Sequence, residues 1–450
     1  GSGSADAPGG ADAPDIPQTP SSLKLDLVWV IDDSTTLCQE QANVGRTFER
    51  FLSGLRASGR VVDLRTAVVR TDVLSGRAQF NAEPRLHGAA CRVSSVKPCL
   101  THAECISSEH DHPPLPEAPG QSTWNCSWSQ TDPKWMMTEN GSVATRCSLI
   151  CDSDEACHAV YGPDYSCRPE GGLVSEPGCW LPPTPCPSLL PSVIQVDAEI
   201  DNAFLFECVA QVGTGSSYTA DLEQGLNAAL LSIEPSGPNA EQSQAILRED
   251  AALLVVFLSD EDDCSLKRDC LIDSSTGTWK DAILSESCLG RGQYHRCAFV
   301  GDTTAGGPLV SVSEYADAFR ALKKDSSKVL VAAIVGDSQK TTDADRETDI
   351  NFFKQAKSSS APLSEQSYIC KSENGVADHG GRYLELVKLF GPRGLAVNIC
   401  GPTPCTRADG SLGVTGARDC EPFPAGSSPR TIAFDTFAER LTAFVLEQAR

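Results

Sequence analysis

Five short segments of the chain are rich in apolar residues and do not alternate with polar ones in the manner of a half-exposed strand. Residues 25–31 have the sequence LDLVWVI, and residues 251–258 have the sequence AALLVVFL. Continuous apolar runs of this length are typical of strands that are covered on both faces, as in parallel sheets. We therefore expect strands at residues 25–31, 65–69, 251–258, 329–335 and 395–399.

Between these runs, apolar residues recur at helical spacing. In residues 40–55 they fall at Val44, Phe48, Phe51 and Leu55, one side of a helix. The same pattern predicts further helices at residues 200–212, 220–233, 315–322, 383–390 and 434–446. Strands that alternate with helices predict an α/β fold, in which a doubly wound, mostly parallel sheet is flanked by helices.

Residues 87–190 have a different character. They hold ten cysteines with much proline, glycine and serine, and they show little periodicity. Two segments, Cys99 to Cys105 and Cys151 to Cys157, share the pattern Cys-x5-Cys. We interpret this region as a disulfide-stapled insertion of two small similar modules, because such modules bury little core and rely on crosslinks. It divides the sheet domain into residues 23–86 and 191–450, and the second part contains a disulfide-bearing excursion at 264–310.

The chain has 20 cysteines and no Cys-x-x-Cys pairs at zinc-binding spacing. This favours disulfide bonds and therefore an oxidising compartment. The cysteines fall into groups of ten, four and four, which could each pair locally, and into the remaining Cys38 and Cys208. We expect Cys38 to form a structural disulfide with Cys208. The alternative is that Cys38 is a nucleophile.

Composition excludes several classes of function. The chain has 450 residues, of which 40% are hydrophobic, and a net charge of -23, which disfavours binding to nucleic acid or to anionic lipid. The longest apolar run is much shorter than the ~20 residues of a membrane span, and no signal peptide opens the chain, as expected of a mature form. Residues 1–22 are predicted to be a flexible tether. Its first residues could follow a lipid-modified cysteine of a bacterial lipoprotein, or Gly1 to Ser4 could be a cloning scar.

Two of the predicted strands end in acidic loops. Asp32, Ser34 and Thr36 follow the first, and Asp260 follows the strand at 251–258. Ligands of open α/β sheets bind at the carboxyl ends of the strands, and carboxylates with hydroxyls suit Mg²⁺, Mn²⁺ or Ca²⁺. The structural alternative for the first loop is a strand end that also caps a helix. We expect Glu261 to Asp263 to form a solvated acidic loop.

These loops carry a resemblance to a known family. VWVIDDSTTLCQEQANV resembles the first strand and metal loop of von Willebrand factor type A (vWA) domains, and LREDAALLVVFLSDEDDCS resembles their later strand with its metal-binding aspartate. VAAIVGD, GGRYLELVKLFG and VNIC resemble the end of the domain in a branch of secreted bacterial vWA lipoproteins. The resemblance covers residues 23–86 and 195–450, with interruptions.

The resemblance implies a metal ion-dependent adhesion site (MIDAS) that holds a divalent cation through Asp32, Ser34, Thr36 and Asp260. The family adds a threonine from a middle loop, here GTGSSYTADLEQGL, where Ser216 or Thr214 would take that role. The chain departs from the family at Thr36, at Thr35 and at Glu261, which follows Asp260 where glycine is usual.

We therefore expect a metal-dependent adhesion or ligand-binding protein of the cell surface or extracellular space, whose ion binds a carboxylate of a partner. We expect no catalysis, since no Gly-x-Ser-x-Gly, His-Glu-x-x-His or Gly-x-x-x-x-Gly-Lys motif is present. The alternatives are a scaffolding lipoprotein with a degenerate metal site that binds through its cysteine-rich insertion, and a hydrolase with an unrecognised site.

Overall fold

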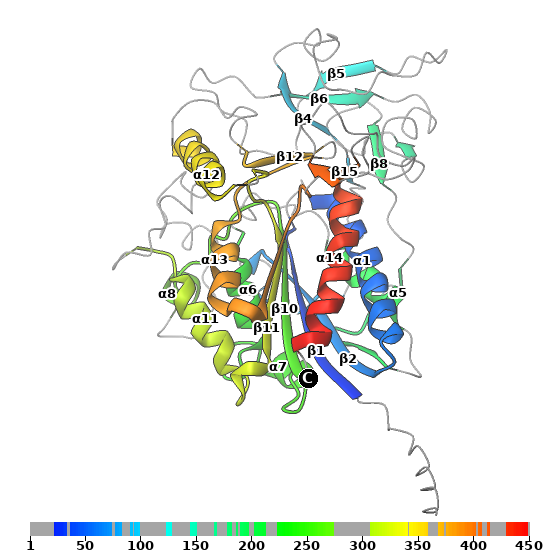
Figure 1. Cartoon of the computed structure of the whole chain (residues 1–450), viewed down its shortest axis with the longest axis vertical. Helices are drawn as coiled ribbons and strands as arrows, with labels where there is room; N and C mark the ends of the chain where they lie inside the picture. Colours follow the sequence, from blue (N-terminus) through cyan, green and yellow to red (C-terminus); the bar gives the residue numbers. More distant parts are fainter. Residues whose placement is uncertain are drawn as a thin grey trace, which may run out of the picture.

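The computed structural model describes residues 22–33, 37–73, 77–82, 186–187, 190–197, 202–212, 223–273, 307–340, 342–358, 368–372, 375–401 and 429–448, together with short strands within 91–181 and 404–414. They form an α/β fold around a six-stranded sheet (Figure 1). Its strand order is β14 (Gly394–Asn398), β11 (Val329–Val335), β10 (Ala252–Ser259), β1 (Ser22–Ile31), β2 (Val61–Arg70) and β9 (Ile194–Val196). The first five are parallel, and β9 runs antiparallel to β2.

Helices cover both faces of the sheet, on its two sides in Figure 1. One face is covered by α1 (Cys38–Ala57), α5 (Ala203–Ala210) and α14 (Pro429–Gln448). The other is covered by α6 (Gly225–Ile233), α7 (Ala240–Ile246), α11 (Val312–Ala321) and α13 (Gly381–Phe390). Alternate residues of β1 supply both cores: Trp29 packs against Phe206 at 5.4 Å between ring centroids, and Val28 faces the opposite side. The predicted doubly wound fold is confirmed.

The sequence pattern located the central strands to within a few residues but missed several elements of the fold. Among them are the short edge strand β9, the helix α7 and the helix α12 (Asp343–Ser358). In α12, adjacent phenylalanines have opposite environments, because Phe353 is buried and Phe352 is 52% exposed. Apart from Ile350 and two alanines, the rest of α12 is polar, so its sequence lacks the apolar stripe that identified the other helices.

Smaller elements complete the described chain. A short helix, α8 (Arg268–Leu271), follows β10, and 3-10 turns precede β11 and β14 at Ser326–Lys328 and Gly391–Arg393. Two hairpins, β12 (Cys370–Ser372) with β13 (Gly375–Ala377) and β15 (Pro404–Thr406) with β16 (Leu412–Val414), lie near the carboxyl ends of the parallel strands (Figure 1).

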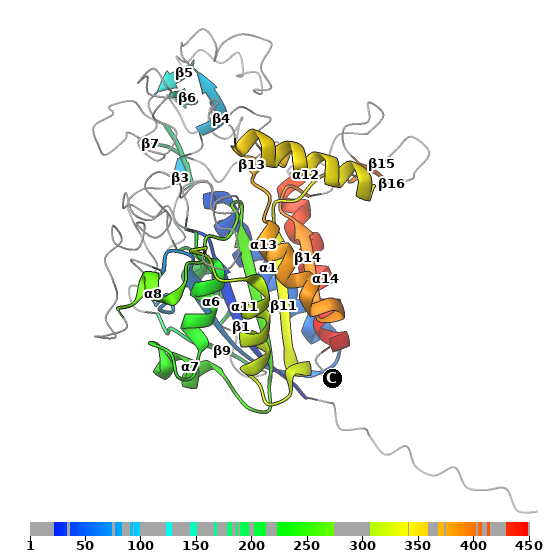
Figure 2. The same cartoon turned by 90° about the vertical axis from the view of Figure 1, so that its left-hand side faces the viewer.

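The predicted insertion contains an antiparallel sheet. Its strands are β3 (Cys91–Arg92), β4 (Ser94–Cys99), β5 (Thr123–Ser127), β6 (Thr145–Ile150), β7 (Ser166–Arg168) and β8 (Gly178–Leu181). Both views place it beyond the carboxyl ends of the parallel strands (Figures 1 and 2), and β4 contacts β13. The chain leaves and returns at one point, because Leu190 N–H donates to the Ala82 carbonyl (3.1 Å). Apart from Cys99, the cysteines of the two repeats lie outside the described residues.

The expected pairing of Cys208 with Cys38 is wrong. Cys208, on α5, is bonded to Cys186, with 5.6 Å between their Cα atoms. The count by groups assumed that the ten cysteines of the insertion pair among themselves, but the fold returns the end of the insertion beside α5. A second disulfide joins Cys370 to Cys400, within one of the expected groups.

These disulfides indicate an oxidising, extracytoplasmic location, because reducing compartments do not maintain such bonds. No helix in the described part of the chain has the length and apolar character that crossing a bilayer requires.

Candidate metal site

The candidate site lies where the strand order of the sheet reverses. The chain winds outward from β1 through β2 in one direction and from β10 through β11 in the other, so β1 and β10 are the two central neighbours. In doubly wound sheets this switch point forms a crevice at the carboxyl ends of the strands, where ligands bind. Asp32 follows β1 and Asp260 follows β10, so both predicted acidic ligands lie at this point.

Hydrogen bonds join the two strand ends. Asp32 N–H donates to the Leu258 carbonyl (3.0 Å), and Ser259 Oγ donates to Asp32 Oδ2 (2.6 Å). Ser259 Oγ in turn accepts from Glu261 N–H (3.1 Å). Asp32 is fully buried and Asp260 is 5% exposed. The first acidic loop is therefore fixed directly to the second.

The structure describes only part of the predicted ligand set. It places Asp32 and Asp260 at the ends of adjacent parallel strands. Ser34 and Thr36 of the first loop, and Thr214 and Ser216 of the middle loop, lie outside the described residues. Their roles stay predictions.

Asp33, next to Asp32, organises the end of β2. Its carboxylate accepts from Asp72 N–H (3.2 Å), lies 3.2 Å from Thr71 Oγ1 and is paired with Arg70 (3.2 Å). All four side chains are buried. Burial, and then the charge of Asp72, raise the pKa of Asp33 to about 6. Asp33 therefore has a structural set of partners.

The solvated loop expected at Glu261 to Asp263 is wrong for its last two residues. Asp263 is fully buried and accepts from Leu226 N–H at the start of α6 (2.9 Å) and from Arg382 Nε (3.0 Å). Asp262 accepts from the N–H of Arg382 at the start of α13 (3.0 Å), and burial raises its pKa to about 7. Each helix start has N–H groups that need acceptors, and this loop supplies them.

Sequence reasoning missed Glu223. It precedes α6, is 1% exposed and accepts a hydrogen bond from the Thr71 hydroxyl, while its Oε1 has no hydrogen-bond partner among the described residues. Burial first, and then the charges of Asp32, Asp33 and Glu261, raise its pKa well above the usual range. The sequence pattern placed Glu223 within a predicted helix at 220–233, so it was not considered as a residue of the site. In the structure α6 begins at Gly225, and Glu223 lies in the loop before it.

The residues at this edge fit a cation. Buried carboxylates at this edge outnumber buried arginines. The buried acidic residues are Asp32, Asp33, Asp72, Glu223, Asp260 and Asp263. The buried arginines of the described chain are Arg70 and Arg382. Uncompensated buried carboxylates favour either protonation or a bound cation. Among the described residues no three His, Cys, Asp or Glu side chains converge on one point. An ion bound through Asp32 and Asp260 would thus need hydroxyls and water as further ligands.

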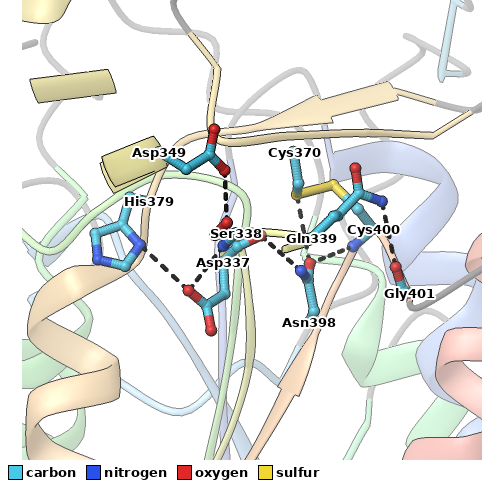
Figure 3. The surroundings of a disulfide bond; sticks show 9 residues. All are labelled: Asp337, Ser338, Gln339, Asp349, Cys370, His379, Asn398, Cys400 and Gly401. Carbon is cyan, nitrogen blue, oxygen red and sulfur yellow. Dashed lines mark hydrogen bonds and ion pairs between the residues drawn. A yellow bond between two sulfur atoms is a disulfide. The ribbon is translucent and has the colours of Figure 1, made fainter. Parts of the chain in front are cut away.

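A second polar cluster beside the site fixes α12 (Figure 3). Asp337, after β11, forms an ion pair with Arg346 of α12, and Ser338 Oγ donates to Asp349 of the same helix (2.5 Å). His379 Nδ1 lies 3.7 Å from Asp337 Oδ1, and burial lowers the pKa of His379. This cluster holds a polar helix at the carboxyl end of β11.

The disulfide in Figure 3 fixes the neighbouring hairpin. Cys370, in β12, is bonded to Cys400, whose N–H donates to Asn398 Oδ1 at the end of β14 (3.0 Å). After β13, Asp378 N–H donates to the Asp260 carbonyl (2.8 Å). The hairpin thereby supports the backbone of the second acidic loop.

No protein-family model matches the chain, and no curated protein matches it significantly. The likeness to a family therefore rests on short sequence motifs, around the ends of β1 and β10 and at β11, α13 and β14.

Proposed function

We propose that this chain is a metal-dependent binding protein with a vWA-type site. Asp32 and Asp260 would bind a divalent cation, and Mg²⁺, Mn²⁺ or Ca²⁺ suit such oxygen ligands. Ser34, Thr36 and either Ser216 or Thr214 would complete the set. The observation that carries the proposal is the meeting of two acidic loops at the switch point, where Ser259 Oγ donates to Asp32.

In this proposal the cation keeps one open position, which a carboxylate of a partner fills. The described residues orient the site. Ser259 orients Asp32 through a hydrogen bond. Asp262 and Asp263 are bound to Arg382 and to the helix starts, so they would not compete with Asp32 and Asp260 for the ion. The disulfides suit a protein at the cell surface, where residues 1–22 could serve as the tether of a lipoprotein.

Calorimetric titration of Mg²⁺, Mn²⁺ and Ca²⁺ into chelator-treated protein tests the proposal. We expect saturable binding that Asp32→Ala weakens at least about 100-fold, because the change removes a charged ligand. Asp317→Ala is the control, since the Asp317 side chain is 79% exposed on α11. Asp32→Asn, checked by circular dichroism, keeps the shape of the buried side chain. If no ion binds to the wild-type protein, the metal site is degenerate.

A second candidate function is a scaffold that binds through the insertion. The insertion's sheet lies beyond the carboxyl ends of the parallel strands, on the same side of the molecule as the candidate metal site (Figure 2). A partner that binds the insertion would therefore approach from the same side as one that binds the metal. The test replaces residues 83–185 with a short Gly-Ser linker, which keeps Cys186 for its bond to Cys208; the ends already lie together, since Ala82 and Leu190 are hydrogen-bonded. Labelled protein is then measured for retention on bacterial cell envelopes. Retention that is lost with the insertion and unaffected by chelator favours the scaffold; retention that survives the deletion excludes it.

A further inference from the structure

A buried tyrosine lies behind the metal site. Tyr383, in the first turn of α13, is fully buried, and its ring packs on Phe257 of β10 at 5.2 Å between centroids. Its hydroxyl has no hydrogen-bond partner among the described residues. A buried hydroxyl that forms no hydrogen bond is costly, so this group needs an explanation.

The start of α6 is shaped around that hydroxyl. A Cβ atom at Gly225 would lie 2.3 Å from Tyr383 Oη, so only glycine admits the ring at this place. The two preceding residues carry further buried polar atoms that lack hydrogen-bond partners in the described chain, namely Glu223 Oε1 and Gln224 Nε2. The oxygen of the Gln224 amide accepts from Leu266 N–H (3.1 Å) and is therefore committed.

The Tyr383 hydroxyl lies within electrostatic range of carboxylates of the site. Burial first, and then the charges of Asp263, Asp32 and Glu223, raise the pKa of Tyr383 well above its usual range. The phenol therefore stays protonated and can donate. It adjoins a segment that offers an amide donor, Gln224 Nε2, and a carboxyl oxygen, Glu223 Oε1.

We infer that Tyr383 is a positioning residue of the metal site, acting through an internal water that it encloses with Glu223 and Gln224. A buried water is stable when two to four polar groups surround it, and a phenol, an amide and a carboxyl group provide that number. The water links α13 to the loop before α6 and restrains the carboxyl group of Glu223, which also accepts from Thr71. This inference rests on the proposed function, because its effect is on metal affinity.

Tyr315 offers a matched control on the same face of the sheet. It is also buried, on the adjacent helix α11, but its hydroxyl donates to Asn227 Oδ1 (2.5 Å) and is fully explained by that bond. Tyr315→Phe and Tyr383→Phe thus delete the same atom from similar surroundings, and only the second touches the inferred water.

The experiment titrates Mg²⁺ into wild-type protein, Tyr383→Phe and Tyr315→Phe, well below their unfolding temperatures. We expect Tyr383→Phe to weaken binding by about five- to tenfold, as for the loss of one hydrogen bond, and Tyr315→Phe to change it by less than about twofold. Equal affinities for wild type and Tyr383→Phe would overturn the inference and leave the proposed function intact.

A measurement without metal keeps the two ideas separate. In chelator, we expect Tyr383→Phe to lower the denaturation midpoint, because its hydroxyl is bonded through the water. An unchanged or raised midpoint would show that the hydroxyl has no partner, which overturns the inference even if the wild-type protein binds no Mg²⁺.

Discussion

Replacing Arg382 with alanine should lower the free energy of unfolding by about 3–5 kcal/mol, because it leaves a buried carboxylate without its cation. Arg382 is 7% exposed, and it binds Asp263 through Nε (3.0 Å) and the Val310 carbonyl through a terminal nitrogen (2.7 Å). Asp263 is fully buried and caps α6, so it cannot turn to solvent when Arg382 is lost.

Arg268→Ala provides the comparison. Arg268 also pairs with a carboxylate, Glu234, but its side chain is 56% exposed, and exposed pairs contribute about 0–1 kcal/mol. Denaturant titration of both variants measures the two effects. A loss below about 1 kcal/mol for Arg382→Ala would mean that the helix start and Ser265 alone hold the charge of Asp263.

In chelator, the protein should lose stability through Asp33 as the pH rises from about 4 to about 6. The pKa of Asp33 is raised from 3.8 to about 6 in the folded protein, so the folded state binds more protons than the unfolded chain between these values. Stability from this group is therefore present at low pH and lost as the pH rises through the folded pKa. The difference between 3.8 and about 6 corresponds to about 3 kcal/mol.

Asp33→Asn isolates this effect from those of the many other carboxylates. We expect the stability of wild type relative to Asp33→Asn to fall by about 2–3 kcal/mol between pH 4.5 and 7.5, measured by urea denaturation. Asp262, with a pKa raised to about 7, and Glu223 act in the same direction in both proteins. A difference that does not vary with pH would contradict the burial of a titrating Asp33.

The sheet could be predicted from the sequence because its strands are buried on both faces. Residues such as 329–335 are apolar throughout, and every residue of β11 is buried. The helix α12 could not be predicted, because it is held by polar contacts of Asp337 and Ser338 and by little apolar surface. The partner of Cys208 depends on where the insertion returns to the sheet domain. Counting cysteines along the sequence gives no information about that position.

Residues of the candidate site could be predicted where they directly follow a strand. Residues whose role depends on a partner far away in the sequence could not be predicted. Asp32 and Asp260 each follow a buried strand directly, so their position was visible in the sequence. The role of Asp263 depends on Arg382, 119 residues further along the chain. Glu223 was assigned to a helix whose start lies two residues later, at Gly225. Helix boundaries are set by partners such as Asp263, which the local pattern does not show.

The hydrogen bond between Ala82 and Leu190 has a consequence for how this protein can vary. The sheet supplies both ends of the intervening segment at one fixed point, so its length hardly affects the core: doubling a flexible loop costs only about 0.6 kcal/mol. Segments of other sizes could be exchanged at this point while the strand ends stay in register. The surface beyond the carboxyl ends of the strands can therefore diversify with little effect on the sheet itself.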